Sequence, residues 1–200
     1  MQAIFSTAYL PPVQYYSALL KHDALHLELY EHYPKQTYRN RCYIYSPNGT
    51  QLLTIPLIHA GERTQTKDIK ISYSDQWQMQ HWRSFEAAYK RSPYFEFYED
   101  ILRPFYETKK NNFLIDFNRE LFEAVNKLMK LNFSFTPTTE YFKSYSDITD
   151  LRDSISPKTR EGQSEFKKYT QVFENKHGFI SNLSIIDLLF NHGPKSGEYL

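Results

Sequence analysis

The fold is interpreted from one stretch, Arg41-Cys-Tyr-Ile-Tyr-Ser-Pro-Asn-Gly-Thr-Gln-Leu-Leu-Thr-Ile-Pro-Leu-Ile58. Two runs rich in aromatic, β-branched and aliphatic residues flank Asn48-Gly49. An Asn-Gly pair suits a tight turn that needs positive φ, so the stretch predicts an antiparallel β-hairpin. Pro56 cannot donate a hydrogen bond to a neighbouring strand, and we therefore expect it at an edge or at the end of a strand.

The residues before the hairpin follow the order strand, helix, strand. Ala3–Thr7 is a short apolar run, and Pro11-Pro12 forces an extended exit from it before Val13–Leu20 can become helical. Residues 25–30 then alternate leucine with more polar side chains, which indicates a strand with one buried face. The opening third of the chain thus predicts a β-α-β unit.

The residues after the hairpin add one strand and three helical segments. Ile69, Ile71 and Tyr73 alternate as in a strand, which would make the sheet mixed. Ser74 or Asp75 is placed to cap a helix that continues to about residue 91. Residues 94–106 form a second, aromatic segment broken by a proline, and residues 112–130 carry apolar side chains at spacings of three and four, as in an amphipathic helix.

The last third of the chain combines an irregular segment with an apolar helix. Residues 132–165 are polar and contain two prolines, so we expect an irregular and partly mobile segment there. Ser184-Ile-Ile-Asp187 has capping-box spacing, which favours a capping role for Asp187 over that of an acid in an apolar helix. The helix that follows is apolar nearly all round and ends at Gly193-Pro194, so it belongs in the core.

These elements predict one α/β domain over residues 1–200. Its mixed central sheet would include the hairpin and would carry helices on its faces, an arrangement compatible with a Rossmann-like three-layer fold. No internal repeat is visible in the sequence.

The composition of the chain disfavours several classes of protein. Lys plus Arg number 24 and Asp plus Glu number 23, so the net charge of +1 disfavours a mainly electrostatic nucleic-acid binder. Cys42 is the only cysteine, which excludes an intramolecular disulfide and favours a cytoplasmic location. The start lacks signal-peptide features, and no run reaches about 18 apolar residues, so we expect no membrane span. No sequence motif indicates a metal or another cofactor.

The segment Lys35-Gln-Thr-Tyr-Arg-Asn-Arg41 is the main candidate for ligand binding. In extended geometry, Arg39 and Arg41 would point to the same side, where two guanidinium groups could bind a phosphate or carboxylate. We expect Lys35 and Asn40 to contribute to this anion site. The alternative is a solvated basic loop in which Glu31 is the partner.

His81 and Tyr16 are further candidates. An imidazole near an anion site can act as an acid or base, whereas the alternative for His81 is a helix histidine bonded to the backbone or to a carboxylate. Tyr16 could stack on a ring of a ligand, although aromatic residues at helical spacing are more often part of the core.

Glu99 is the candidate carboxylate. It lies with Glu96 and Asp100 in an aromatic stretch, where partial burial would raise a carboxyl pKa and equip it for proton transfer. The alternative is a salt bridge to Arg83, Lys90 or Arg103.

Several stretches that together cover most of the chain share one resemblance: Tyr9-Leu-Pro-Pro-Val-Gln-Tyr-Tyr16, Gln36-Thr-Tyr-Arg-Asn-Arg41 with Asn48-Gly49, Leu53-Thr-Ile-Pro56, His81-Trp-Arg83 and Asn182-Leu-Ser-Ile-Ile-Asp-Leu-Leu-Phe-Asn191. They resemble the WbqC-like family, a bacterial family whose members occur among genes for O-antigen and other surface-polysaccharide assembly. The resemblance implies a cytoplasmic role in preparing an activated sugar, as a transferase.

The residues and the resemblance lead to one hypothesis and one rival. In the hypothesis the protein transfers a group on a nucleotide-linked or phosphorylated sugar: Arg39 and Arg41 hold the anionic group, Asn40 orients it, and His81 or Glu99 moves a proton. Tyr16 would stack on a ring. The rival is a non-catalytic binding or partner subunit of a polysaccharide-biosynthesis complex, which would show an exposed aromatic patch instead of an enclosed cleft.

Overall fold

The computed structural model describes residues 1–58, 61, 63–159 and 166–200. The chain opens with the expected β-α-β unit, formed by β1 (Gln2–Ser6), α1 (Val13–Leu19) and β2 (Ala24–Glu28). The two strands pair in parallel, with Gln2 opposite Ala24 and Ser6 opposite Glu28. Parallel pairing requires a crossover connection, which α1 provides.

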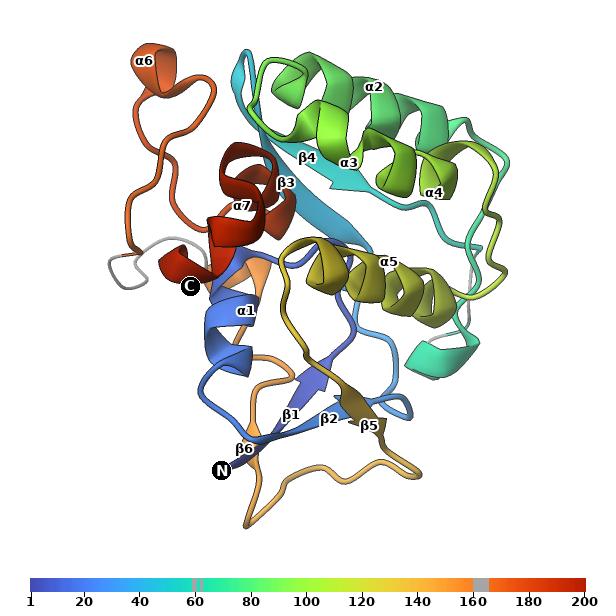
Figure 1. The fold of residues 1–200 in the computed structure, drawn as a ribbon. Helices are drawn as coiled ribbons and strands as arrows, with labels where there is room; N and C mark the ends of the chain where they lie inside the picture. The colour runs from blue at the N-terminus through green and yellow to red at the C-terminus, as the bar shows by residue number, and fades with distance from the viewer. Residues whose placement is uncertain (59–60, 62, 160–165) are drawn as a thin grey trace.

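The central sheet is parallel and has the strand order β5-β2-β1-β6 (Figure 1). Its outer strands, β5 (Phe135–Pro137) and β6 (Thr149–Asp150), both lie within residues 132–165, where the sequence indicated only irregular structure. A 3-10 turn follows at Pro157–Thr159. Residues 160–165 of that segment lie outside the described residues.

The hairpin is confirmed, and it stands as a separate antiparallel sheet. It consists of β3 (Arg41–Ser46) and β4 (Gly49–Thr54). Gly49 closes the turn with a φ of 96°, a backbone conformation that glycine adopts without steric cost. The fold is therefore mixed α/β, with its parallel and antiparallel strands in two sheets.

The strand expected at residues 69–73 is wrong. A 3-10 turn at Thr66–Asp68 precedes this stretch, which forms only two isolated bridges, Leu57 with Ile71 and Lys70 with Phe113. Its backbone groups are shared between the segment after β4 and the segment before the amphipathic helix, because Ile71 donates to the carbonyl of Asn112. The pairing on each side is limited to a single bridge, so no ladder extends along residues 69–73.

The expected helices are present between the hairpin and the last third. Their bounds are Trp77–Tyr89 (α2), Phe95–Leu102 (α3), Pro104–Glu107 (α4) and Leu114–Leu128 (α5). The capping expected from Ser74 or Asp75 is wrong: α2 begins at Trp77, and the side chain of its N-cap residue, Gln76, makes no capping bond. Figure 1 shows α5 between the parallel sheet on one side and the hairpin with α2, α3 and α4 on the other. No helix of the described chain is both long and apolar enough to cross a membrane.

The C-terminal helix lies in the core, as expected. After the short α6 (Glu174–His177), α7 (Ile185–His192) is buried from Ile185 to Asn191, and a 3-10 stretch, Gly193–Tyr199, follows it. Ser184 caps α7 by accepting a hydrogen bond from the backbone of Ile186. The loop after β1 holds the start of α7, because Ile185 donates to the carbonyl of Pro11.

Candidate functional site

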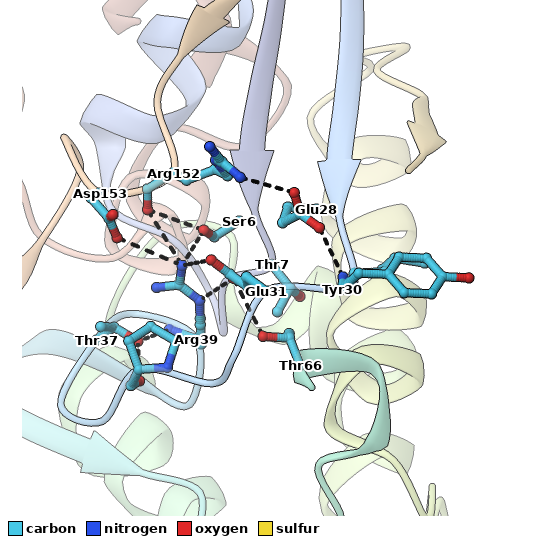
Figure 2. A network of polar contacts seen from close by, with 12 residues as sticks. Ser6, Thr7, Glu28, Tyr30, Glu31, Thr37, Arg39, Thr66, Arg152 and Asp153 are labelled. Carbon is cyan, nitrogen blue, oxygen red and sulfur yellow. Dashed lines mark hydrogen bonds and ion pairs between the residues drawn. The ribbon is translucent and has the colours of Figure 1, made fainter. Parts of the chain in front are cut away.

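The carboxyl ends of the parallel strands are the first place to look for a site. Open parallel sheets bind ligands in the crevice beyond the strand ends, where the strand order reverses. Here β2 lies on one side of β1 and β6 on the other, so the order reverses at β1. Figure 2 shows that polar and charged side chains from the ends of β1 and β2 and from later loops gather at this edge.

Arg39 and Glu31 form the centre of this network. Arg39 Nε donates to Glu31 Oε1 at 2.7 Å, and Arg39 Nη2 donates to Glu31 Oε2 at 2.8 Å. The same Nη2 also donates to the hydroxyl of Ser6, and Thr66 donates to Glu31. Both charged residues are buried, so the partnership with Glu31 foreseen as the alternative for the basic segment is realised for Arg39.

Arg152 and Glu28 form the second half of the network. Arg152 Nη1 donates to Glu28 Oε2 at 3.0 Å, and Glu28 is fully buried at the end of β2. Arg152 also bonds to Asp150 and to the carbonyls of Phe142 and Lys143. These bonds lower the pKa of Asp150 and raise that of Arg152. The strand-end crevice is therefore closed by the protein's own paired charges.

A cavity of about 720 Å³ lies beside this network, between the loop after β2 and the base of the hairpin. We call it the basic pocket, because its lining includes Lys35, Asn40 and Arg41 and, among the described lining residues, no acidic side chain. Thr54 and Ile55 form the hairpin side of the pocket. Three of the five ligand-binding residues expected from the sequence thus line one cavity.

Arg41 is the most distinctive group of the basic pocket. It is half-buried, and its side chain forms no hydrogen bond or ion pair with the described residues. Its Nε and the hydroxyl of Tyr33, another lining residue, are both buried without such a partner. Lys35 is exposed, whereas Asn40 is buried and donates to the carbonyl of Ile55 at 2.8 Å. Within the described part of the chain, the pocket therefore combines an unpaired guanidinium with an amide held by a hydrogen bond.

Arg39 and Arg41 do not act together in this structure. The expectation of a shared side assumed extended backbone through both residues, whereas β3 begins only at Arg41 and Arg39 lies in the turn before it. The turn directs Arg39 to Glu31, while Arg41 lines the basic pocket. The two guanidinium groups are thus divided between the internal network and the pocket.

His81 lies behind the wall of the basic pocket. Its Nδ1 is 2.8 Å from the hydroxyl of Tyr9, which in turn is 2.9 Å from the hydroxyl of Tyr106. Burial lowers the pKa of His81 to about 4, against the opposing effect of a hydrogen bond to the backbone of Thr54. The imidazole is therefore neutral at pH 7, and hydrogen bonds to the Tyr9 hydroxyl and to the backbone of Thr54 hold it in place.

Glu99 and Tyr16 lie away from the basic pocket. Glu99 accepts a hydrogen bond from Arg103 one helical turn later, at 3.0 Å, which is one of the salt bridges foreseen as its alternative. Tyr16 is fully buried, and its ring stacks on Phe122 with centroids 5.6 Å apart.

Asp187 is a buried carboxylate whose environment the sequence did not reveal. The capping role expected for it is wrong: its Oδ2 accepts hydrogen bonds from Tyr169 at 2.7 Å and from Gln171 at 2.9 Å. Burial raises the pKa of Asp187 to about 6, although these hydrogen bonds act in the opposite direction. The sequence did contain a signal for a buried acid, namely a carboxylate inside an otherwise apolar helix. The capping-box spacing from Ser184 favoured the other interpretation.

No metal centre is assembled by the described residues, since none of their His, Cys, Asp and Glu side chains form a cluster of three potential ligands.

Comparison with known proteins places the chain in a family. The model of the WbqC-like protein family matches residues 7–162 and 158–199. The chain belongs to the WbqC-like protein family. The resemblance found in the sequence is thereby confirmed. The lining of the basic pocket and the two buried ion pairs, Arg39 with Glu31 and Arg152 with Glu28, lie within the matched residues of this WbqC-like protein. A Mycobacterium tuberculosis protein named Uncharacterized protein Rv1507c is 24% identical over 222 residues, which cover 99% of this chain and 96% of that protein. No solved structure matches the chain.

Proposed function

We propose that this WbqC-like protein binds a nucleotide-linked or phosphorylated sugar in the basic pocket and acts in the cytoplasm in group transfer on that sugar, in bacterial surface-polysaccharide biosynthesis. The observation that carries the proposal is the half-buried guanidinium of Arg41, which lines the pocket without an acidic partner among the described residues. Family membership supports the pathway, since the WbqC-like family is named for a gene of an O-antigen cluster.

The physical argument rests on charge balance. A partly buried cation is costly unless an anion compensates it, and a guanidinium matches the geometry of phosphate oxygens through two parallel hydrogen bonds. Lys35 adds a second positive charge from the exposed loop at the pocket. An anion bound here would supply the counter-charge that Glu31 supplies to Arg39.

Of the other candidate residues, Asn40 and His81 have roles in this proposal that follow from their positions. Asn40 holds Ile55 in place and so fixes the wall of the pocket. His81 acts as a positioning residue, because it bonds to the backbone of Thr54, which lines the pocket. Glu99 and Tyr16 are left out, since one pairs with Arg103 on the surface and the other is sealed in the core.

A thermal-shift panel of sugar nucleotides and sugar phosphates tests the proposal. A ligand at about 100 times its dissociation constant stabilises the fold by about 2.7 kcal/mol, which raises the melting temperature by several degrees. Arg41→Gln should reduce the shift to about half or less, since a tenfold loss of affinity leaves about 1.4 kcal/mol of stabilisation, and it should change the unliganded melting temperature little. Arg83→Gln, which removes an exposed arginine outside the pocket, should retain the full shift. A panel that is silent for the wild-type protein would refute the proposal.

The alternative, a non-catalytic partner subunit, is favoured by one surface feature. Phe97 and Ile101 lie one turn apart on α3 and are 74% and 44% exposed. An exposed apolar pair of this kind is typical of protein contacts. This alternative predicts co-purification of a stoichiometric partner that Phe97→Ser removes, with a silent ligand panel. The same Phe97→Ser variant should bind sugar nucleotides normally if the enzyme proposal holds.

A further inference from the structure

Part of the lining of the basic pocket is apolar and accessible. Pro56, Leu57 and Ile58 line the pocket from the segment that follows β4, and none of the three is buried. Ile58 is 52% exposed. The backbone of this segment is held in place, because the N–H of Ile58 donates to the carbonyl of Lys70 at 2.9 Å. The pocket therefore offers a ligand a fixed apolar surface as well as its cations.

Tyr33 adds an aromatic ring to the lining. The residue is half-buried and its hydroxyl oxygen is fully buried, so its side chain presents ring carbons rather than a polar group to the pocket. Burial raises the pKa of Tyr33, so the phenol is uncharged at pH 7 and does not repel an anion. We call Tyr33, Pro56, Leu57 and Ile58 the apolar lining.

The basic pocket has few partners for the hydroxyl groups of a sugar. Apart from Tyr33, the uncharged polar side chains among the described lining residues that are not buried are those of Gln36 and Thr54. Asn40 is buried, and its amide already donates to the carbonyl of Ile55. A hydroxyl that leaves water without gaining a hydrogen bond costs free energy, whereas the flat faces of a nucleobase suit apolar and aromatic side chains. The apolar lining thus favours a base over a sugar ring.

We infer that, of the two ligand classes in the proposed function, on which this inference rests, the basic pocket selects the nucleotide-linked sugar and binds it by its nucleotide. The phosphate groups lie against the guanidinium of Arg41, and Lys35 adds its charge from the exposed loop. The base packs on the apolar lining, where Ile58 determines specificity through its exposed apolar surface. A phosphorylated sugar without a base would leave this surface against water or against hydroxyl groups without partners.

Isothermal titration with AMP, GMP, CMP and UMP, each compared with ribose 5-phosphate, isolates the contribution of the base. All five compounds carry the same phosphate on a ribose, and only the nucleotides carry a base. At least one nucleotide should bind the wild-type protein at least about tenfold more tightly than ribose 5-phosphate and glucose 1-phosphate, because only a base buries apolar surface against the lining.

Two variants test whether the base lies on the apolar lining. Ile58→Ser shortens an exposed side chain, so the fold should persist while the affinity for the tightest nucleotide falls about threefold or more. Its affinity for ribose 5-phosphate should stay unchanged, because Arg41 and Lys35 remain. Leu20→Ser is the matched control: Leu20 is 49% exposed and lies outside the pocket, so this variant should bind nucleotides like the wild-type protein.

The outcomes distinguish failure of this inference from failure of the proposed function. Ribose 5-phosphate that binds as tightly as all four nucleotides would overturn the inference and leave the proposed function standing. Equal nucleotide affinity of Ile58→Ser and Leu20→Ser would do the same. Binding of octyl phosphate with silent nucleotides would overturn the inference in favour of a lipid phosphate. Silence of every phosphate compound, sugar nucleotides included, would refute both.

Discussion

Arg39 and Glu31 face each other through two parallel hydrogen bonds, Nε to Oε1 at 2.7 Å and Nη2 to Oε2 at 2.8 Å, inside the protein at the carboxyl edge of the parallel sheet (Figure 2). Because of this pairing, the two arginines of the segment Lys35–Arg41 have different roles. Arg39 compensates a buried carboxylate, whereas Arg41 is left for the basic pocket.

The buried pair should be far more sensitive to substitution than Arg41. Removing one partner of a buried ion pair leaves an uncompensated charge, which costs about 3–5 kcal/mol. We therefore expect Arg39→Gln to lower the free energy of unfolding by that amount in urea titrations. Arg41→Gln should change it by less than about 1 kcal/mol. Equal small effects of both substitutions would show that the pair contributes little to stability.

Local patterns were sufficient to predict part of the fold. The hairpin follows from Asn48-Gly49 between two β-rich runs, and α5 follows from apolar residues at helical spacing. In contrast, β5 and β6 span only Phe135–Pro137 and Thr149–Asp150. Strands of three and two residues carry no detectable period, and their pairing with β2 and β1 depends on contacts between segments far apart in the chain.

The candidate site was predicted in part for a similar reason. Lys35, Asn40 and Arg41 were found because they cluster in sequence. Arg39 and Arg41 would share one side only if extended backbone began at Arg39. In the structure β3 begins at Arg41, so the two side chains separate. Glu31 lies close to Arg39 in the sequence and was foreseen as its alternative partner, whereas Arg152 reaches Glu28 from a distant segment and had no sequence signal of its own.

His81 should make stability fall at acidic pH. Its folded-state pKa is about 4, below the ordinary value of 6.5, so below pH 6.5 the unfolded chain binds a proton that the folded protein excludes. The stability of the wild-type protein relative to His81→Gln should therefore decrease by about 3 kcal/mol between pH 7 and pH 4. Urea titrations at several pH values measure this, and a pH-independent difference would show that His81 is protonated in the folded state.

Asp187 should have the opposite effect to His81 on how stability changes with pH. Its folded-state pKa is about 6, above the ordinary value of 3.8, so the folded protein retains a proton that the unfolded chain has lost. Stability relative to Asp187→Asn should therefore decrease by about 2 kcal/mol as the pH rises from 4 to 7. Comparison with the asparagine variant cancels other titrating groups, including His192 next to Tyr169. A difference that grows in favour of the wild-type protein with rising pH would contradict the burial of an uncompensated carboxylate.

Gly193 should tolerate no side chain. Its φ is 54°, and a Cβ placed there would lie 2.4 Å from Cδ1 of Tyr94. Gly193→Ala should therefore destabilise the protein by more than about 1 kcal/mol, since backbone strain and a clash act together. Gly197→Ala is the matched control, because a Cβ there would make an ordinary contact of 3.7 Å with Leu131. Equal melting temperatures of the two variants would mean that the end of α7 adapts.

Isothermal titration of the wild-type protein and Arg41→Gln, each with a stabilising sugar nucleotide and with the corresponding uncharged sugar, tests anion binding in the basic pocket most directly. We expect the sugar nucleotide to bind the wild-type protein and Arg41→Gln to lose at least about tenfold in affinity, since hydrogen bonds to charged groups contribute about 1.5–3 kcal/mol. The uncharged sugar should bind both proteins equally weakly. Equal affinity of the two proteins for the sugar nucleotide would show that Arg41 does not hold the anion.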